Sequence, residues 1–255
     1  MVDVTCISSP EAKDADVIYA VGDIHGRLDL LIEMEEAIAD DIRRTSPRRP
    51  VICYLGDYVD RGPSSAGVIE YLIRLSSASG SRVFLKGNHE DRLLAFLDEP
   101  AASGPRWMDF GGREALESYG VIAPAEFQSG DWATLRDAFA RALPGEHLRF
   151  FQDLRLGFAW RRYLFVHAGL DPSRPAEDQT AHDLMWIRDP FLTSDRDWGV
   201  TVVHGHVIVG EPEFRANRIA IDTGAYKSGR LTCLVTSAAE PRVIAVGAAA
   251  RPGHA

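Results

Sequence analysis

Five short polar clusters in this 255-residue chain contain side chains that commonly bind metals. In chain order they are GDIHG (22–26), GDYVDRG (56–62), GNHE (87–90), HAG (167–169) and HGH (204–206). Their carboxylate, imidazole and amide ligands, without a thiolate, suit Mn²⁺, Fe or Zn²⁺ in a mixed nitrogen and oxygen site. Two cations ~3.5–4 Å apart need a bridging carboxylate and separate end ligands. The clusters supply enough groups for such a pair.

Each cluster stands at the end of a segment predicted to be a buried strand. These strands are residues 17–21, 51–55, 82–86, 163–167 and 201–206. The carboxyl ends of strands in an α/β sheet converge on one crevice, where ligands bind. Taken singly, Asp23 with His25 is more typical of a turn or helix cap, and His167 of a hydrogen-bonded core histidine. Capping does not explain five such clusters, so we expect them to meet in space.

The order of predicted elements indicates how the strands are arranged. Predicted helices at 28–44, 64–77 and 90–97 alternate with the first three strands, which predicts a parallel sheet with helices on its faces. Later strands are expected at 218–222 and at two further segments, 231–237 and 242–246. The shorter loops between these final strands favour antiparallel pairing.

Residues 98–154 have a different character, with Pro and Gly breaks, three helix-like segments and no clear strand. We interpret them as a helical insertion within a single domain that spans residues 1–255. The insertion either caps the site or only covers one face of the sheet, and the sequence leaves both readings open. Trp107 and Phe110 in this region, like Trp186 and Trp198 later in the chain, are expected to pack rather than to bind substrate.

Composition excludes several classes of protein. A net charge of −9 argues against non-specific binding to nucleic acid or anionic lipid. No stretch approaches ~20 uninterrupted apolar residues, so no membrane span is expected. Residues 1–16 lack the basic start and apolar core of a signal peptide. The three cysteines fit no metal or redox spacing, and their low number suits a reducing compartment. These features together predict a cytoplasmic protein.

The order GDIHG, GDYVDRG and GNHE resembles the signature of the phosphoprotein phosphatases within the calcineurin-like metallophosphoesterases. HAG and HGH complete the pattern, and MWIRDPFL (185–192) and IDTGAY (221–226) add to the resemblance. It runs from about Val17 to about Tyr226 and is closest to short bacterial and bacteriophage serine/threonine phosphatases. It implies an α/β fold (α+β by strict classification), namely a calcineurin-like β-sandwich flanked by helices with the helical insertion at about 98–154.

The resemblance also implies two metal sites that share one carboxylate. The first metal would be held by Asp23, His25 and Asp57, and the second by Asp57, Asn88, His167 and His206. The family has Gly-His-Thr where this chain has Gly205-His206-Val207, a change that removes a hydroxyl but no ligand. Two divalent ions are expected, Mn²⁺ first, with Fe or Zn²⁺ as alternatives. His204 is left open between a hydrogen-bond donor to a ligand and a substrate contact.

Catalysis in such a site requires a proton donor for the leaving group. His89 is the expected general acid. In the family it is oriented by an aspartate at the position of Asp60, which here could instead cap the helix near Ser64. We favour the pairing of Asp60 with His89. Glu90 is expected to cap the helix that follows it.

Positive charge is needed around the substrate phosphate. Arg61 directly follows the GDYVD turn and can offer a bidentate fork to this phosphate. The resemblance to the phage and bacterial enzymes implies Arg188 as a second contact, and Asn88 is expected to contact the phosphate as well. For Arg61 the alternative is a salt bridge to a ligand carboxylate. For Arg188 the alternative is pairing with Asp189 or Asp183.

The expected activity is direct hydrolysis of phosphoserine and phosphothreonine monoesters by a hydroxide that bridges the two metals, without a phosphoenzyme. The partner would be a phosphorylated protein or peptide, or a small phosphoester, and not a nucleic acid or a membrane. The alternative is a diadenosine polyphosphate hydrolase of the same superfamily. A third hypothesis, a non-enzymatic binding protein on this scaffold, is disfavoured because all proposed ligands and the proposed acid are present.

Overall fold

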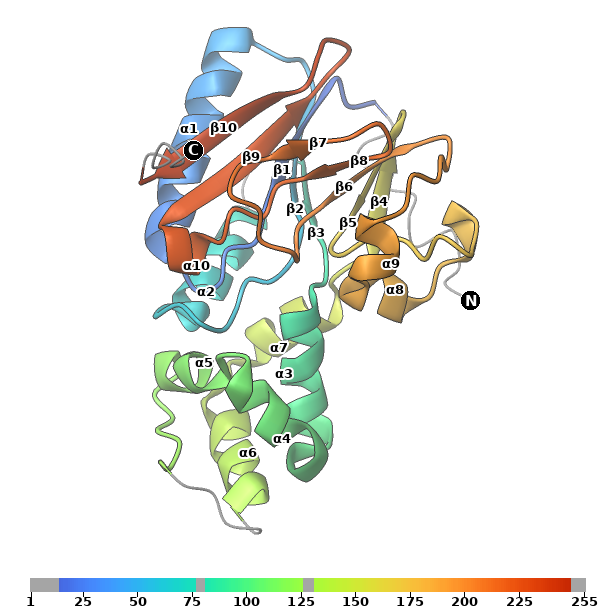
Figure 1. The fold of residues 1–255 in the computed structure, drawn as a ribbon. Coiled ribbons are helices and arrows are strands. Elements are labelled where there is room, and N and C mark those ends of the chain that lie inside the picture. The colour runs from blue at the N-terminus through green and yellow to red at the C-terminus, as the bar shows by residue number, and fades with distance from the viewer. Residues whose placement is uncertain (1–13, 77–80, 126–130, 249–255) are drawn as a thin grey trace, which may run out of the picture.

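The computed structural model describes residues 14–76, 81–125 and 131–248. Residues 1–13, most of the segment assessed for a signal peptide, lie outside the described residues. Two sheets are stacked face to face, with helices on their outer faces and a group of helices below them (Figure 1). The chain therefore has an α/β architecture of two mixed sheets flanked by helices, as the sequence predicts.

The first sheet has the strand order β10-β9-β1-β2-β3. Its strands are β1 (Val17–Val21), β2 (Pro50–Tyr54), β3 (Ser81–Phe84), β9 (Arg230–Thr236) and β10 (Arg242–Gly247). β1, β2 and β3 are parallel, and β9 is antiparallel to both β1 and β10. The parallel arrangement predicted for the first three strands and the antiparallel pairing of the last two are both confirmed.

The second sheet has the order β4-β5-β6-β8-β7. Its strands are β4 (Gly157–Trp160), β5 (Tyr163–Val166), β6 (Thr201–His204), β7 (Glu213–Phe214) and β8 (Arg218–Ala220). β6 and β8 are parallel, so the expectation of antiparallel pairing is wrong for this pair. The unpredicted strand β7 runs antiparallel to β8 and returns the chain across the sheet, so that β8 runs in the direction of β6.

Alternation along the strands explains why the sheets stack. In β1, Ile18 and Ala20 point into the core between the sheets, whereas Tyr19 points to the opposite face, toward the helices. In β5, Phe165 enters the same inter-sheet core and Leu164 faces outward. β1 and β5 thus bury both of their faces. The carboxyl ends of the parallel strands in both sheets are held at one edge.

Ten α-helices occur in the described residues. They are α1 (Leu28–Thr45), α2 (Ser65–Ser76), α3 (Asn88–Asp98), α4 (Pro100–Asp109), α5 (Gly112–Ser118), α6 (Asp131–Ala142), α7 (Gly145–Gln152), α8 (Ala181–Trp186), α9 (Asp189–Leu192) and α10 (Ala225–Ser228). α1 and α2 cover the first sheet, and α8 and α9 cover the second (Figure 1). No described helix combines the length and apolar character needed to cross a bilayer.

The region predicted as a helical insertion folds as α4 to α7 and lies with α3 below the sheets (Figure 1). Its core is aromatic: the Trp107 ring lies 4.7 Å from that of Phe96 and 5.6 Å from that of Phe139. The sequence did not predict α4 as a helix, because it contains Gly104 followed by a proline. Gly104 packs against Trp132 so closely that a Cβ would overlap the indole, and this tertiary contact outweighs the weak local helix propensity.

A buried polar group joins α1 to the first sheet. Tyr54 donates a hydrogen bond to Glu35 at 2.5 Å, and Arg82 donates to the other oxygen of Glu35 at 2.9 Å. The side chains of Glu35 and Arg82 are only 9 % and 11 % exposed, so each charge is stabilised mainly by the other and little by water. Removing one partner would leave the other charge buried and uncompensated.

We predict that Arg82→Ala lowers the free energy of unfolding by roughly 3 kcal/mol, because Glu35 loses its cation. Arg74→Ala is the matched control. Its guanidinium is 66 % exposed and pairs with Glu70 at 3.8 Å, so a loss below about 1 kcal/mol is expected. Urea denaturation of both variants measures the difference. Equal losses would show that the Glu35–Arg82 pair contributes no more than a surface pair.

Candidate metal centre and active site

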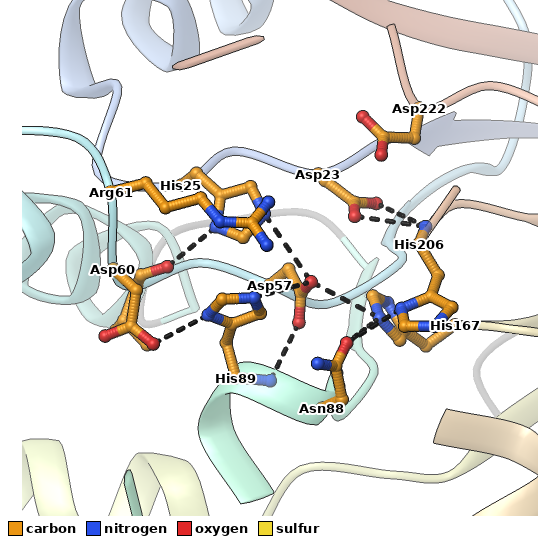
Figure 2. A network of polar contacts seen from close by, with 12 residues as sticks. Asp23, His25, Asp57, Asp60, Arg61, Asn88, His89, His167, His206 and Asp222 are labelled. Atoms are coloured by element: carbon orange, nitrogen blue, oxygen red, sulfur yellow. Dashed lines mark hydrogen bonds and ion pairs between the residues drawn. The ribbon is translucent and has the colours of Figure 1, made fainter. Parts of the chain in front are cut away.

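The polar turns that follow β1, β2, β3, β5 and β6 meet at one edge of the two sheets (Figure 2). The side chains that gather there are no more than 7 % exposed: Asp23, His25, Asp57, Asn88, His167 and His206. Segments up to 183 residues apart in the chain are in direct contact at this edge. The structure therefore brings all six predicted ligands into one buried cluster, which we call the cage.

Asp57 occupies the centre of the cage. Its Oδ2 lies 3.5 Å from Nε2 of His25 and 3.4 Å from Nε2 of His167. Its Oδ1 accepts a hydrogen bond of 3.0 Å from the backbone N–H of His89. Gly87 permits this approach, since a Cβ there would overlap Oδ1 of Asp57. A carboxylate that faces imidazoles on two sides is suited to bridge two cations.

The side chain of Asn88 completes one half of the cage. Its Oδ1 lies 3.0 Å from Nε2 of His167 and 2.8 Å from Nδ1 of His206. Asp57, His167 and His206 each place a ligand atom within 4.8 Å of the other two. This half therefore offers four oxygen and nitrogen atoms around one point.

On the other side of Asp57, the ligand atoms of His25, Asp57 and His89 also lie within 4.8 Å of one another. Asp23, predicted to share this half with His25, accepts hydrogen bonds from the backbone N–H of His206 at 3.1 and 3.3 Å. A Cβ at Gly205 would overlap Oδ1 of Asp23, which explains the glycine before His206. Asp23 thus lies between the two halves, between His25 and His206 in Figure 2.

Asp222 is a buried carboxylate of this site that the sequence analysis did not select. It follows β8, and the charge of Asp222 raises the pKa of Asp23, adding to the larger effect of burial. Burial raises the pKa of Asp222 itself to about 6. The signal was present, because IDTGAY places an aspartate at the end of the strand predicted at 218–222.

The loop after β2 has an unusual backbone conformation. Asp57, Asp60 and Arg61 have φ values of 51°, 71° and 68°, in the left-handed region that side chains disfavour. Glu90 stabilises this loop by accepting hydrogen bonds from the backbone N–H groups of Asp57 and Tyr58, at 3.0 and 2.8 Å. Strain of ~1–3 kcal/mol per residue persists only where the surroundings impose it.

Glu90 also accepts a hydrogen bond of 2.9 Å from the backbone N–H of Gly87, the residue before α3. The expectation that Glu90 caps this helix is therefore met. Its contacts with the Asp57 loop, which join the turns after β2 and β3 into one unit, were not predicted from the sequence pattern. Burial, followed by the charge of Asp57, raises the pKa of Glu90 to about 7.

His89 and Asp60 form the predicted pair. Nδ1 of His89 lies 2.6 Å from Oδ2 of Asp60, and both side chains are at most 1 % exposed. Burial lowers the pKa of His89 to about 4 and raises that of Asp60, so the pair disfavours two separated charges and shares one proton. Trp107 donates from its indole N–H to both oxygens of Asp60 at 3.1 Å. Trp107 was expected only to pack, and it also holds this carboxylate in place.

Asp60 does not cap α2 with its carboxylate. Its backbone N–H instead donates to the hydroxyl of Ser65 at 3.0 Å, which anchors the loop to the start of that helix.

Arg61 forms no ion pair with a carboxylate among the described residues. Its Nη1 lies 3.0 Å from Nε2 of His25, and its guanidinium lies over the ring of Tyr226, 4.7 Å from the centroid. The backbone carbonyl of Gly111 accepts a hydrogen bond of 3.2 Å from Arg61 N–H. The side chain is thus directed toward the cage, where a bound phosphate could accept its N–H groups.

Arg188 lies exposed just before α9 and forms no ion pair with Asp189 or Asp183. Asp183 instead accepts hydrogen bonds from Thr180 at the start of α8. Burial and then the charge of His167 lower the pKa of His206 to about 2, and the charge of Arg188 contributes a smaller part of this shift. A contact between Arg188 and phosphate remains a prediction.

His204 is buried, but its ring packs against Phe191 of α9 at 5.1 Å. Its Nδ1 lies 3.0 Å from the carbonyl of Gly205, and no described cage side chain forms a hydrogen bond with it. The structure therefore favours neither of the two roles that the sequence left open for His204.

The helical insertion reaches the site through the turn between α4 and α5. The Phe110 ring lies 5.9 Å from that of His89, edge to face. A hollow of about 380 Å³ adjoins this turn and is lined on one side by Arg61 and Tyr226, and on the other by Phe110 and Arg113. The insertion therefore forms one wall of this hollow, next to Arg61, beyond covering the sheet.

Comparison with known proteins identifies the family. The model for calcineurin-like phosphoesterases matches residues 17–231, most of the chain. The chain belongs to the calcineurin-like phosphoesterase family.

Relatives include proteins named bis(5'-nucleosyl)-tetraphosphatase PrpE [asymmetrical]. Those of Bacillus cereus (strain 03BB102) and Anoxybacillus flavithermus are each 26% identical to this chain, and each match covers 84% of this chain and 88% of the relative.

Similar solved structures share the fold. A putative diadenosine tetraphosphatase has a TM-score of 0.62 at 20% identity and covers 94% of this chain and 96% of its own. A Saccharomyces cerevisiae serine/threonine phosphatase has a TM-score of 0.56 at 14% identity. The match covers 96% of this chain and 84% of the phosphatase chain. A cold-active protein-tyrosine phosphatase from a Shewanella species also has a TM-score of 0.56, at 15% identity. The match covers 93% of this chain and 80% of that phosphatase chain.

Calcineurin-like phosphoesterases use a dinuclear divalent metal centre, and the cage fits one. Burial lowers the pKa of His25 and of His206, so both imidazoles are neutral at pH 7, the form that binds metal. Burial would raise the pKa of Asp57, but His167 and then His89 lower it well below its usual value. Burial would lower the pKa of His167, but the charge of Asp57 raises it to about 10, so this imidazole must release a proton to bind a divalent cation. Asp57, Asn88, His167 and His206 would hold one cation, and His25, Asp57 and Asp23 the other.

We predict that Asp57→Asn reduces the metal content of the purified protein from two equivalents of Mn²⁺ toward one or none, because the shared ligand loses its charge. Metal analysis after equilibrium dialysis measures this. Asp40→Asn, a change at a carboxylate 71 % exposed on α1, is the control and should bind metal as the parent does. Retention of two equivalents in Asp57→Asn would exclude a bridging role.

Proposed function

We propose that this chain hydrolyses dinucleoside polyphosphates by breaking a phosphoric anhydride bond with metal-activated water. The observation that supports hydrolysis is the cage centred on Asp57, with the His89–Asp60 pair beside it. The proteins named as asymmetrical tetraphosphatases, similar over 84% of this chain, support a nucleotide substrate. The alternative reading of the sequence thus becomes the preferred one.

Each residue of the site has a separate role in the proposed reaction. When bound, the two cations lower the pKa of the attacking water and offset the negative charge of the phosphate. Arg61 binds the non-bridging oxygens of the phosphoryl group, and Asn88 contacts the same group from the opposite side. His89 donates a proton to the leaving oxygen, while Asp60 and Trp107 fix the orientation of its ring. Water adds to phosphorus as the bond to the leaving group breaks.

A protein phosphatase is the second candidate function. The specific observation in its favour is the fully buried His89–Asp60 pair, because a serine or threonine alkoxide is far more basic than a nucleotide leaving group and depends more on a proton donor. The two candidates share the cage and differ in what lies beyond the reacting phosphate.

We predict that metal-depleted protein regains activity when Mn²⁺ is added, and that kcat/KM is higher for diadenosine tetraphosphate than for a phosphoserine peptide. Chromatography of the nucleotide products and release of phosphate from the peptide measure the two rates. Fe²⁺ and Zn²⁺ are added to parallel samples. A higher kcat/KM for the peptide would replace the nucleotide proposal with the phosphatase, and full activity in excess chelator would overturn both.

We predict that His89→Gln lowers kcat by about 10²–10⁴-fold for phenyl phosphate and by less for 4-nitrophenyl phosphate, whose leaving group needs no proton. His182→Gln is the control, since His182 is exposed on α8. Steady-state rates with both esters give the ratio. An equal loss for the two esters would assign His89 to metal binding instead of proton donation.

A further inference from the structure

Arg92 is a cation beside the active site that the mechanism above does not use. It lies on α3, three residues after His89, and is partly exposed. Its guanidinium lies 4.5 Å from the ring centroid of Phe110 and 4.5 Å from that of Trp186. Two aromatic faces therefore hold it in a fixed position.

Arg92 forms no ion pair with a carboxylate among the described residues, and the more distant charges of Asp91 and Asp60 do not prevent burial from lowering its pKa. No described residue accepts a hydrogen bond from its Nε. The neighbouring Asp91 contacts other groups: its oxygens lie 3.1 Å from Nζ of Lys86 and 3.2 Å from Nε1 of Trp186. In a chain of net charge −9, an arginine that forms no ion pair in the described residues and lies next to the catalytic groups points to an anion from outside the protein.

The position of Arg92 defines which part of a substrate it could contact. Phe110 links it to His89, because the Phe110 ring lies 5.9 Å from the His89 ring and also carries the Arg92 guanidinium on its face. The charge of Arg92 is close enough to contribute to the lowered pKa of His89, where burial is the main cause. His89 is the proposed donor to the leaving oxygen. Arg92 therefore lies on the leaving-group side of the reacting phosphate.

We propose that Arg92 is a specificity-determining residue that binds the phosphate chain of the leaving nucleotide. This inference rests on the proposed function. A serine or threonine leaving group is a neutral alcohol, whereas asymmetric hydrolysis of a dinucleoside tetraphosphate releases a nucleoside triphosphate with several negative charges. The planar guanidinium, held between aromatic rings, can present two parallel N–H groups to phosphate oxygens.

The competing explanation is that Arg92 only joins α3 to the aromatic residues of the insertion and of α8. A structural clamp of this kind would affect every substrate and inhibitor equally. An anion contact would affect only ligands that extend beyond one phosphate. The ratio of two inhibition constants therefore separates the explanations, even if diadenosine tetraphosphate is not a substrate.

The test uses the full chain loaded with Mn²⁺ and measures inhibition of 4-nitrophenyl phosphate hydrolysis by ATP and by inorganic phosphate. We expect Arg92→Gln to raise the ratio of Ki for ATP to Ki for phosphate by about 10- to 100-fold, the usual effect of losing a charge-assisted hydrogen bond. Arg92→Lys, which keeps the charge without the planar fork, should give a smaller rise. The kcat/KM for diadenosine tetraphosphate should fall in parallel with the ratio.

Arg141→Gln is the matched control. Arg141 is exposed on α6 and does not line the hollow beside Arg61, so the ratio should not change. An unchanged ratio in Arg92→Gln would overturn the proposal, as would an equal rise in both inhibition constants accompanied by a lower melting temperature. If the parent is inhibited by ATP but does not cleave diadenosine tetraphosphate, the proposed function fails while the Arg92 contact is still tested.

Discussion

The structure of the site depends on one buried carboxylate, that of Asp57. It is 2 % exposed, and imidazoles from the turns after β1, β3 and β5 surround it at 3.4–3.8 Å. An isolated carboxylate at such a depth is strongly destabilising, so the surrounding nitrogen atoms offset its burial, and bound cations would offset it further. The convergence of strands from both sheets on this edge makes that arrangement possible.

The second constraint comes from the helical insertion. Trp107 on α4 supplies both oxygens of Asp60 with a hydrogen bond, and Gly111 accepts a hydrogen bond from the backbone of Arg61. The insertion thus positions two residues of the loop after β2, although it contributes no predicted metal ligand. Trp107 is itself fixed by the aromatic core of the insertion, with Phe96 and Phe139. The chemistry of the site is therefore linked to the packing of helices that lie outside the sandwich.

Sequence reasoning located the parts of the site that depend on local pattern. Asp23, Asp57 and Asn88 each follow an apolar segment and a glycine. This pattern predicts both the end of a strand and a tight turn. It could not locate groups whose role depends on tertiary contact. The bond from Trp107 to Asp60 joins residues 47 positions apart, and the guanidinium of Arg92 is placed by two rings from different helical regions. Asp222 was within reach of the same pattern, but β8 spans only three residues and its turn has no histidine.

The left-handed backbone at His25, Asp57, Asp60, Arg61 and His206 has a consequence for how such a chain changes under selection. Glycine would relieve the backbone at each of these positions, so heat tolerance and turnover make opposite demands on the same five residues. A library screened only for survival at high temperature should accumulate glycine or asparagine there and lose activity first. Variants screened for both properties should acquire their stabilising changes in the sandwich and on the outer faces of the helices.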